Sequence, residues 1–209
     1  MGILNSIKKI FKGGAEPKAI PTPEEANASA ERYYIASIEE DRAQKDRFFR
    51  MDPHSPIAER MDFAGLAYYP PDPAYRYALP LHPATEPERL IFQTSTGDEQ
   101  PYDRIGTIEF TVAGQLASLA IYRSPQHGGL FLPFRDATSG TETYGAGRYL
   151  EPHDLGGGDL LVDFNLSYSP FCAYSDAYSC PLPPFENHLT TIAIRAGEKA
   201  DYVQNSETT

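Results

Sequence analysis

The stretch "IGTIEFTVAGQLASLAIYR", residues 105–123, contains two runs in which apolar and polar side chains alternate, separated by Ala113-Gly114-Gln115. Alternation with a period of two residues is typical of a β-strand with one buried face. Glycine in a short connection between two such runs indicates a tight hairpin. Strands joined by so short a connection are antiparallel, since a parallel crossover needs about a dozen residues or more. The stretch therefore predicts an antiparallel hairpin.

Similar runs occur on both sides of this hairpin. They are short, rich in β-branched and aromatic residues and bounded by turn signals, and they cover residues 89–95, 129–136, 147–152, 159–166 and 190–197. We expect a mainly β domain of the α+β class, an antiparallel meander of about six or seven strands with N-terminal helices packed outside it. The pattern leaves open whether the strands close as a barrel or fold as a sandwich.

The residues before these strands have helical signals. Thr22 and Glu25 form a capping box, which predicts a helix over residues 23–51. Its middle, "EEDRAQKDR" at residues 39–47, is charged nearly all round, and we interpret it as a solvated face. A second, shorter helix is predicted over residues 55–65.

The two ends of the chain differ from its centre. Residues 1–20 read as an appendage and linker, and the basic amphipathic pattern of residues 3–12 suits weak contact with a membrane surface or with a partner. We expect one β-barrel-like domain with its N-terminal helices over residues 21–200, and a disordered tail over residues 201–209.

Composition excludes several classes of function. The chain has 209 residues, with 41% hydrophobic and 22% charged residues, which is typical of a globular protein. Its formal net charge of −11 argues against nucleic acid as a partner, because phosphate binding needs a basic surface. The sequence contains no apolar run long enough for a membrane span and no secretory signal. We therefore predict a cytoplasmic protein, with a membrane-peripheral location left open by its N-terminus.

One predicted strand carries polar residues on the face opposite its apolar side chains. Within residues 159–166, the even-numbered positions from Leu160 to Leu166 are apolar, whereas Asp163 and Asn165 fall on the other face. If that face is buried, the carboxylate needs a partner, because burying an unpaired charge is very costly.

Arginines at the ends of neighbouring strands are candidates for this partner. We expect Arg135 and Arg148 to face Asp163, Asp136 and Glu198. Two readings stay open. The charges form a structural ion-pair network, or the arginines line a polar pocket and bind a carboxylate or phosphate ligand in bidentate fashion.

Both cysteines lie in the proline-rich loop between two predicted strands. Cys172 and Cys180 could form a disulfide or stay reduced as small, partly buried hydrophobes, which is the first choice for a cytoplasmic protein. The spacing C-x7-C-x7-H to His188 matches no usual ligand hairpin. We therefore predict no metal site from these residues together with His153.

Three long strings in this chain resemble the uncharacterised prokaryotic family known as domain of unknown function 1684. They are "SPIAERMDFAGLAYYPPDPAYR" (55–76), "FLPFRDATSGTETYGAGRYLEP" (131–152) and "DFNLSYSPFCAYSDAYSCPLPPFENHLTTIAIRAGEK" (163–199). The resemblance covers about residues 30–200 and implies a single domain dominated by β-structure, with no established activity, cofactor or substrate. Ser169 stands where the family usually has asparagine, and His188 where arginine is more usual. A cysteine–histidine nucleophile that requires His188 would therefore not be a family mechanism.

The leading hypothesis is a small-molecule-binding β-barrel domain with an arginine-lined polar pocket for an anionic ligand. The candidate ligand-binding residues are Arg135, Asp136, Tyr144, Arg148, Asp163, Asn165, Tyr168 and Glu198. The second hypothesis is a hydrolase-like enzyme that uses Asp163, Glu198 or Cys172 as acid, base or nucleophile. The third is a peripheral scaffold whose N-terminal helix binds a membrane or a partner. No cofactor, catalytic residue or oligomeric state is assigned from the sequence.

Overall fold

The structure is a computed structural model that describes residues 23–58, 60–125 and 128–200. It divides into two compact units, residues 1–33 and 34–209. The described part of the first unit is the beginning of a helix, and everything that follows concerns the second unit. The predicted appendage at residues 1–20 and the predicted tail at residues 201–209 lie outside the described residues, and the boundaries of the expected domain, residues 21–200, stay a prediction.

The predicted N-terminal helix is confirmed. Helix α1 extends over Pro23–Met51, and its second half packs on the body of the second unit through Ile38 and Phe49, which are 3% and 1% exposed. Within the described ranges, no helix combines the length and the apolar character needed to cross a membrane.

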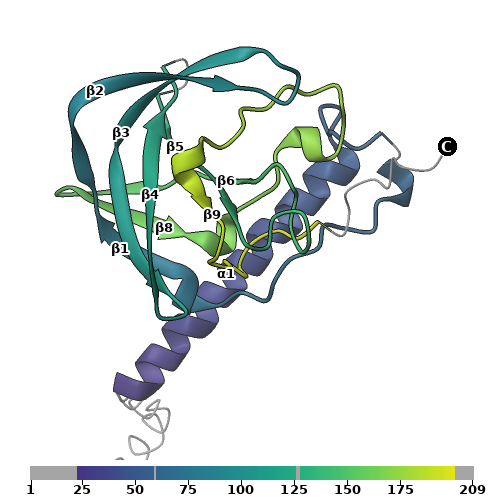
Figure 1. The fold of residues 1–209 in the computed structure, drawn as a ribbon. Coiled ribbons are helices and arrows are strands. Elements are labelled where there is room, and N and C mark those ends of the chain that lie inside the picture. Colours follow the sequence, from purple (N-terminus) through teal and green to yellow (C-terminus); the bar gives the residue numbers. More distant parts are fainter. Residues whose placement is uncertain (1–22, 59, 126–127, 201–209) are drawn as a thin grey trace, which may run out of the picture. The chain divides into compact units, whose positions relative to one another are not determined.

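The strands form two sheets (Figure 1). The larger sheet has the order β2-β3-β4-β5-β6, and its strands are β2 (His82–Gln93), β3 (Glu99–Val112), β4 (Gln115–Arg123), β5 (Leu130–Asp136) and β6 (Arg148–Leu150). A short strand, β9 (His188–Leu189), pairs in parallel with β5. The smaller sheet has the order β1-β8-β7, and its strands are β1 (Arg76–Pro80), β8 (Asp159–Asp163) and β7 (His153–Gly156).

The hairpin predicted from residues 105–123 is present and is tighter than expected. Val112 pairs with Gln115, so Ala113 and Gly114 alone form the turn. Both have positive φ angles, 48° and 76°, as a type I′ turn requires. This turn fixes the register of β3 and β4, and the register places the apolar side chains of both strands on one face.

The core lies between the two sheets. Apolar side chains from both sheets and from the segment after β9 form one cluster, whose fully buried members include Ile108, Leu119, Ile121, Leu132, Phe134, Val162, Phe164 and Ile194. No strand pairing in the described residues joins the two sheets into a closed ring. The sandwich option of the prediction therefore fits, and the closed barrel was wrong.

The segment "TTIAIRAG", residues 190–197, was predicted as a strand but pairs with no neighbouring strand. Its backbone forms hydrogen bonds with side chains in place of a neighbouring strand. The Ile194 amide donates to Asp136 Oδ2 at 2.5 Å, and the Ile194 carbonyl accepts from Arg148 Nη2 at 2.8 Å. The segment is extended and buried because charged side chains satisfy its backbone, which local sequence does not reveal.

Two further expectations were wrong. The predicted helix over residues 55–65 is reduced to a 3-10 turn at Arg60–Asp62, because the Ser55 and Arg60 side chains donate to the carbonyls of Phe49 and Asp52 and turn the chain. The alternation in residues 159–166 also stops early. Strand β8 ends at Asp163 and a 3-10 turn, Phe164–Leu166, follows, which leaves Leu166 43% exposed.

Candidate functional site

Arg148 and Asp136, two of the predicted site residues, form an ion pair inside the core. Their side chains are 1% and 0% exposed, and Arg148 Nη2 lies 3.4 Å from Asp136 Oδ2. The guanidinium also donates to the carbonyl oxygens of Ile194 and Ala196, at 2.8 and 2.5 Å. Burial lowers the pKa of Arg148, and Asp136 counteracts this effect. Because both side chains are enclosed and bonded to the chain itself, the pair contributes to the stability of the fold.

Asp163 and Asn165 belong to a second polar cluster, at the point where β8 ends. The Tyr34 hydroxyl donates to Asp163 Oδ2 at 2.8 Å, and Asn165 Nδ2 donates to the Tyr34 oxygen at 2.9 Å. Arg76 Nε lies 3.6 Å from Asp163 Oδ2. Burial, followed by the bond to Asp163, raises the pKa of Tyr34, so the tyrosine stays a donor. The cation beside Asp163 is therefore Arg76 and not one of the two predicted arginines.

The remaining predicted residues lie elsewhere. Arg135 borders a separate hollow of about 240 Å³ that Asp136 and His188 also line, and it makes no ion pair with any residue that the structure describes. The Tyr144 hydroxyl donates to Cys172 Sγ at 3.9 Å. The eight predicted residues are thus distributed over several places, and the structure does not gather them in one pocket.

The two cysteines are free thiols in the structure. Cys172 is partly buried and Cys180 is buried, and the Cys172 amide donates to Cys180 Sγ at 3.4 Å. His153 is exposed on β7, and His188 Nε2 lies 3.0 Å from the Pro183 carbonyl. Across residues 23–58, 60–125 and 128–200, no three His, Cys, Asp or Glu side chains are grouped in a way that could hold a metal ion.

Another hollow near the predicted residues lies between α1 and the turn after β8. We call it the helix groove. Its apolar part has a volume of about 440 Å³ and is lined by Gln44, Lys45, Phe48, Phe49, Leu166, Tyr168 and Phe171. Its polar part has about 70 Å³ and is lined by Asp41, Arg42, Lys45, Tyr68, Asn165, Leu166, Ser167 and Tyr168. The two parts adjoin, since Lys45, Leu166 and Tyr168 line both.

Arg42 is the notable charge of the polar part. Its guanidinium stacks on Tyr68 at 4.5 Å from the ring centroid and donates to the carbonyls of Tyr69 and Asn165 at 2.9 and 3.3 Å. Within the described ranges it has no ion-pair partner, and its Nε and the Tyr68 hydroxyl make no hydrogen bond. Burial lowers the pKa of Arg42. A partly buried cation without a carboxylate favours an anion beside it.

Lys45 lines both parts of the groove, and the buried carboxylate of Glu198 balances its charge. Its Nζ lies 2.5 Å from Glu198 Oε2, 5.0 Å from the Tyr168 ring centroid and 5.3 Å from that of Phe49. Glu198 is fully buried, and burial raises its pKa while Lys45 lowers it. The Tyr168 hydroxyl donates to Glu151. Glu198 thus fixes the position of Lys45 and is not exposed to the groove.

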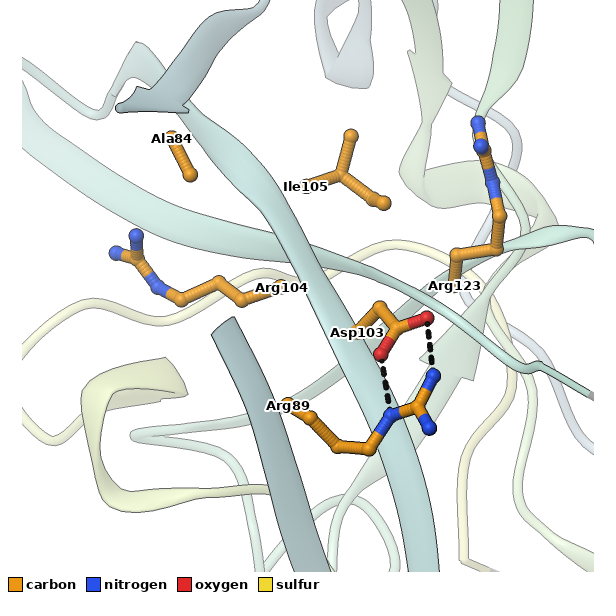
Figure 2. Close-up of a pocket in the computed structure, with 6 residues that line it drawn as sticks. All are labelled: Ala84, Arg89, Asp103, Arg104, Ile105 and Arg123. Atoms are coloured by element: carbon orange, nitrogen blue, oxygen red, sulfur yellow. Dashed lines mark hydrogen bonds and ion pairs between the residues drawn. The ribbon is translucent and has the colours of Figure 1, made fainter. Parts of the chain in front are cut away.

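A second hollow lies on β2, β3 and β4, and three arginines border it (Figure 2). It has a volume of about 590 Å³. Two of its arginines are already paired with carboxylates. Arg89 donates to both oxygens of Asp103 at 2.8 and 3.1 Å, as the dashed lines in Figure 2 show, and Arg104 is paired with Glu186 at 3.0 Å. An anion entering this hollow would compete with these carboxylates, so the helix groove is the better candidate.

The sequence reading missed Arg42, Lys45 and Tyr68. The stretch at residues 39–47 was interpreted as a solvated face, but Arg42 and Lys45 are partly buried. A usable signal was present: Arg42, Lys45 and Phe49 follow one another at helical spacing and share a face with a buried aromatic residue. Their partners, however, come from distant parts of the chain, such as Glu198, 153 residues after Lys45.

The fold and the groove define a β-sandwich domain with one flanking helix. A model of the family described as "Protein of unknown function (DUF1684)" matches residues 61–199. The chain belongs to this family.

A solved structure is similar over most of its length. The solution NMR structure of the uncharacterized protein from gene locus rrnAC0354 of Haloarcula marismortui is 38% identical in sequence, with a TM-score of 0.62. The match covers 82% of this chain and 97% of that one. A comparison with curated proteins found no match. These comparisons support the fold and the family and attach no activity to either.

Proposed function

We propose that the chain binds a small organic anion in the helix groove. The observation that supports this proposal is Arg42, whose guanidinium borders the polar part of the groove and forms no ion pair with a carboxylate in the described residues. Buried or partly buried charges in proteins are normally paired. A carboxylate on the ligand would supply the missing partner.

The shape of the groove indicates the rest of the ligand. The apolar part is bordered by Phe48, Leu166 and Phe171, and its volume of about 440 Å³ lies in the range of small-molecule sites, roughly 300–1,000 Å³. The predicted residues Asn165 and Tyr168 border the polar end. The proposed ligand is therefore a monocarboxylate with an apolar body of a few carbon atoms.

The enzymatic hypothesis receives less support at the two carboxylates that it names. The side chains of Asp163 and Glu198 are 5% and 0% exposed, and each is paired with a cation. A general acid or base has to come within hydrogen-bond distance of the substrate, and enclosed, paired carboxylates are poorly placed for that. The third hypothesis, a scaffold that uses residues 3–12, falls outside the described residues.

Binding is tested by titrating the protein with hexanoate, with hexan-1-ol and hexylammonium as matched probes, by calorimetry or chemical-shift changes. We expect hexanoate to bind best, because only it supplies a carboxylate to Arg42. Arg42→Met should weaken hexanoate binding about tenfold or more, since a hydrogen bond to a charged group contributes about 1.5–3 kcal/mol.

The matched control is Arg47→Met on the same helix, because Arg47 is 59% exposed and pairs with Glu40. It should leave hexanoate affinity unchanged. Equal binding of all three probes, or equal losses in the two arginine variants, would contradict the proposal.

A further inference from the structure

The two thiols lie against each other at the ends of one loop. Cys172 belongs to the 3-10 turn Phe171–Ala173, and Cys180 follows the loop of residues 174–179. The Cys172 amide donates to Cys180 Sγ at 3.4 Å. The sulfur of one cysteine is therefore held at the backbone of the other, which is the proximity that disulfide formation needs.

Both ends of this loop are fixed, whereas its middle is exposed. The Cys180 amide donates to Ser95 Oγ at 3.1 Å, and its carbonyl accepts from the Ser95 amide at 2.9 Å. The Ala173 amide next to Cys172 donates to the Pro170 carbonyl at 2.9 Å. Between these anchors, Asp176, Ala177 and Ser179 are exposed. Both cysteines are therefore anchored to their surroundings, while part of the loop between them is exposed to solvent.

The two thiols have different surroundings. Cys172 is partly buried, and the Tyr144 hydroxyl donates to its Sγ at 3.9 Å. The interaction with the Cys180 thiol is the main reason that the pKa of Cys172 falls to about 6. The same interaction, together with burial, raises the pKa of Cys180. The pair therefore consists of a partly buried thiol with a lowered pKa and a buried thiol with a raised pKa, and lowering the pKa favours the thiolate, which is the nucleophilic form.

We propose that Cys172 and Cys180 are a redox-active pair that reduces a hydroperoxide and forms a reversible intramolecular disulfide. The Cys172 thiolate attacks the terminal peroxide oxygen, the O–O bond breaks, and the alkoxide leaves with a proton as alcohol or water. Cys172 is then a sulfenic acid. Cys180 Sγ attacks Cys172 Sγ, the S–O bond breaks, and the departing hydroxide takes the Cys180 proton to form water. Two thiols lose two electrons and the peroxide gains them.

Tyr144 has a positioning role in this scheme. Its hydroxyl donates to Cys172 Sγ and stabilises the thiolate. Its own pKa is raised, mainly by burial and then by the neighbouring cysteine, so it keeps its proton while Cys172 ionises. Tyr144→Phe should shift the pH midpoint of Cys172 reactivity upward while both cysteines remain present, a change that a purely structural role would not produce.

To test the proposal, the full-length reduced protein is treated with hydrogen peroxide, and the number of free thiols and the mass of the intact protein are measured over time. We expect the two free thiols to disappear together and the mass to fall by about 2 Da, with both changes reversed by a dithiol reductant. In Cys180→Ser, a sulfenic acid should accumulate at Cys172 and react with dimedone. In Cys172→Ser, peroxide consumption should slow by at least about tenfold.

Peptide mapping of the unmodified chain covers the case in which a variant fails to fold. A limiting amount of iodoacetamide should label Cys172 before Cys180, with a rate that rises through a midpoint near pH 6. The proposal is overturned if peroxide leaves both thiols free, if the mass rises by added oxygen without a disulfide, or if both cysteines are labelled equally fast.

Discussion

Replacing Arg148 with methionine is expected to lower the free energy of unfolding by about 3–5 kcal/mol, the range for breaking a buried ion pair from one side. The substitution leaves Asp136, whose side chain is 0% exposed, without its cation. It also removes the donors that bind the Ile194 and Ala196 carbonyls, so buried acceptors lose their partners. Urea unfolding followed by circular dichroism measures the change.

Arg135→Met is the matched control for this variant. Arg135 is partly buried on the same sheet but has no ion pair in the described part of the chain. Its replacement should change the free energy of unfolding by no more than about 1 kcal/mol. A loss below that value for Arg148→Met, or equal losses for the two variants, would show that the buried pair does not hold the C-terminal segment.

Lys45→Met is expected to have the second large effect, about 3–5 kcal/mol at neutral pH. Glu198 is fully buried and Lys45 is its only ion-pair partner in the described residues. Burial already raises the pKa of Glu198 and Lys45 lowers it, so the variant raises this pKa further. When the pKa of a carboxyl group is higher in the folded state than in the unfolded state, the folded state is more stable with that group protonated.

The raised pKa of Glu198 determines how the effect of Lys45→Met on stability varies with pH. The penalty of Lys45→Met should be largest above the folded pKa of Glu198 and should shrink as the pH falls and the carboxyl group takes a proton. Adding Glu198→Gln should restore most of the lost stability at neutral pH, because it removes the unpaired charge. Unfolding curves at several pH values check both results, and a penalty that does not vary with pH would rule out Glu198 as its source.

Local patterns predicted the fold well where local interactions determine it. The hairpin at residues 105–123 was readable because strand alternation and a glycine turn act within a few residues. The helix over Pro23–Met51 was readable from its capping box. The segment at residues 190–197 looked like a strand, but Asp136 and Arg148 bind its backbone, and such contacts leave no pattern in the segment itself.

The candidate site was harder to predict for the same reason. Asn165 and Tyr168 were selected and do border the helix groove, but the cations opposite them come from α1. In a helix that is charged on nearly all sides, the spacing of Arg42, Lys45 and Phe49 indicates which face is covered but does not show what covers it. That depends on the packing of Leu166 and Tyr168 against Arg42 and Lys45, which is set by the tertiary fold.

The hydrogen bonds between Arg148 and the C-terminal segment also affect the order in which the domain folds during synthesis. The carbonyl oxygens of Ile194, Ala196 and Glu198 that it binds come 46, 48 and 50 residues later in the chain. On a ribosome, β6 therefore emerges well before the groups that satisfy its guanidinium. Until they appear, Arg148 has to stay hydrated, and the apolar faces of the larger sheet cannot close over it. This domain is thus expected to remain open late in translation, in the period when nascent chains depend most on chaperones.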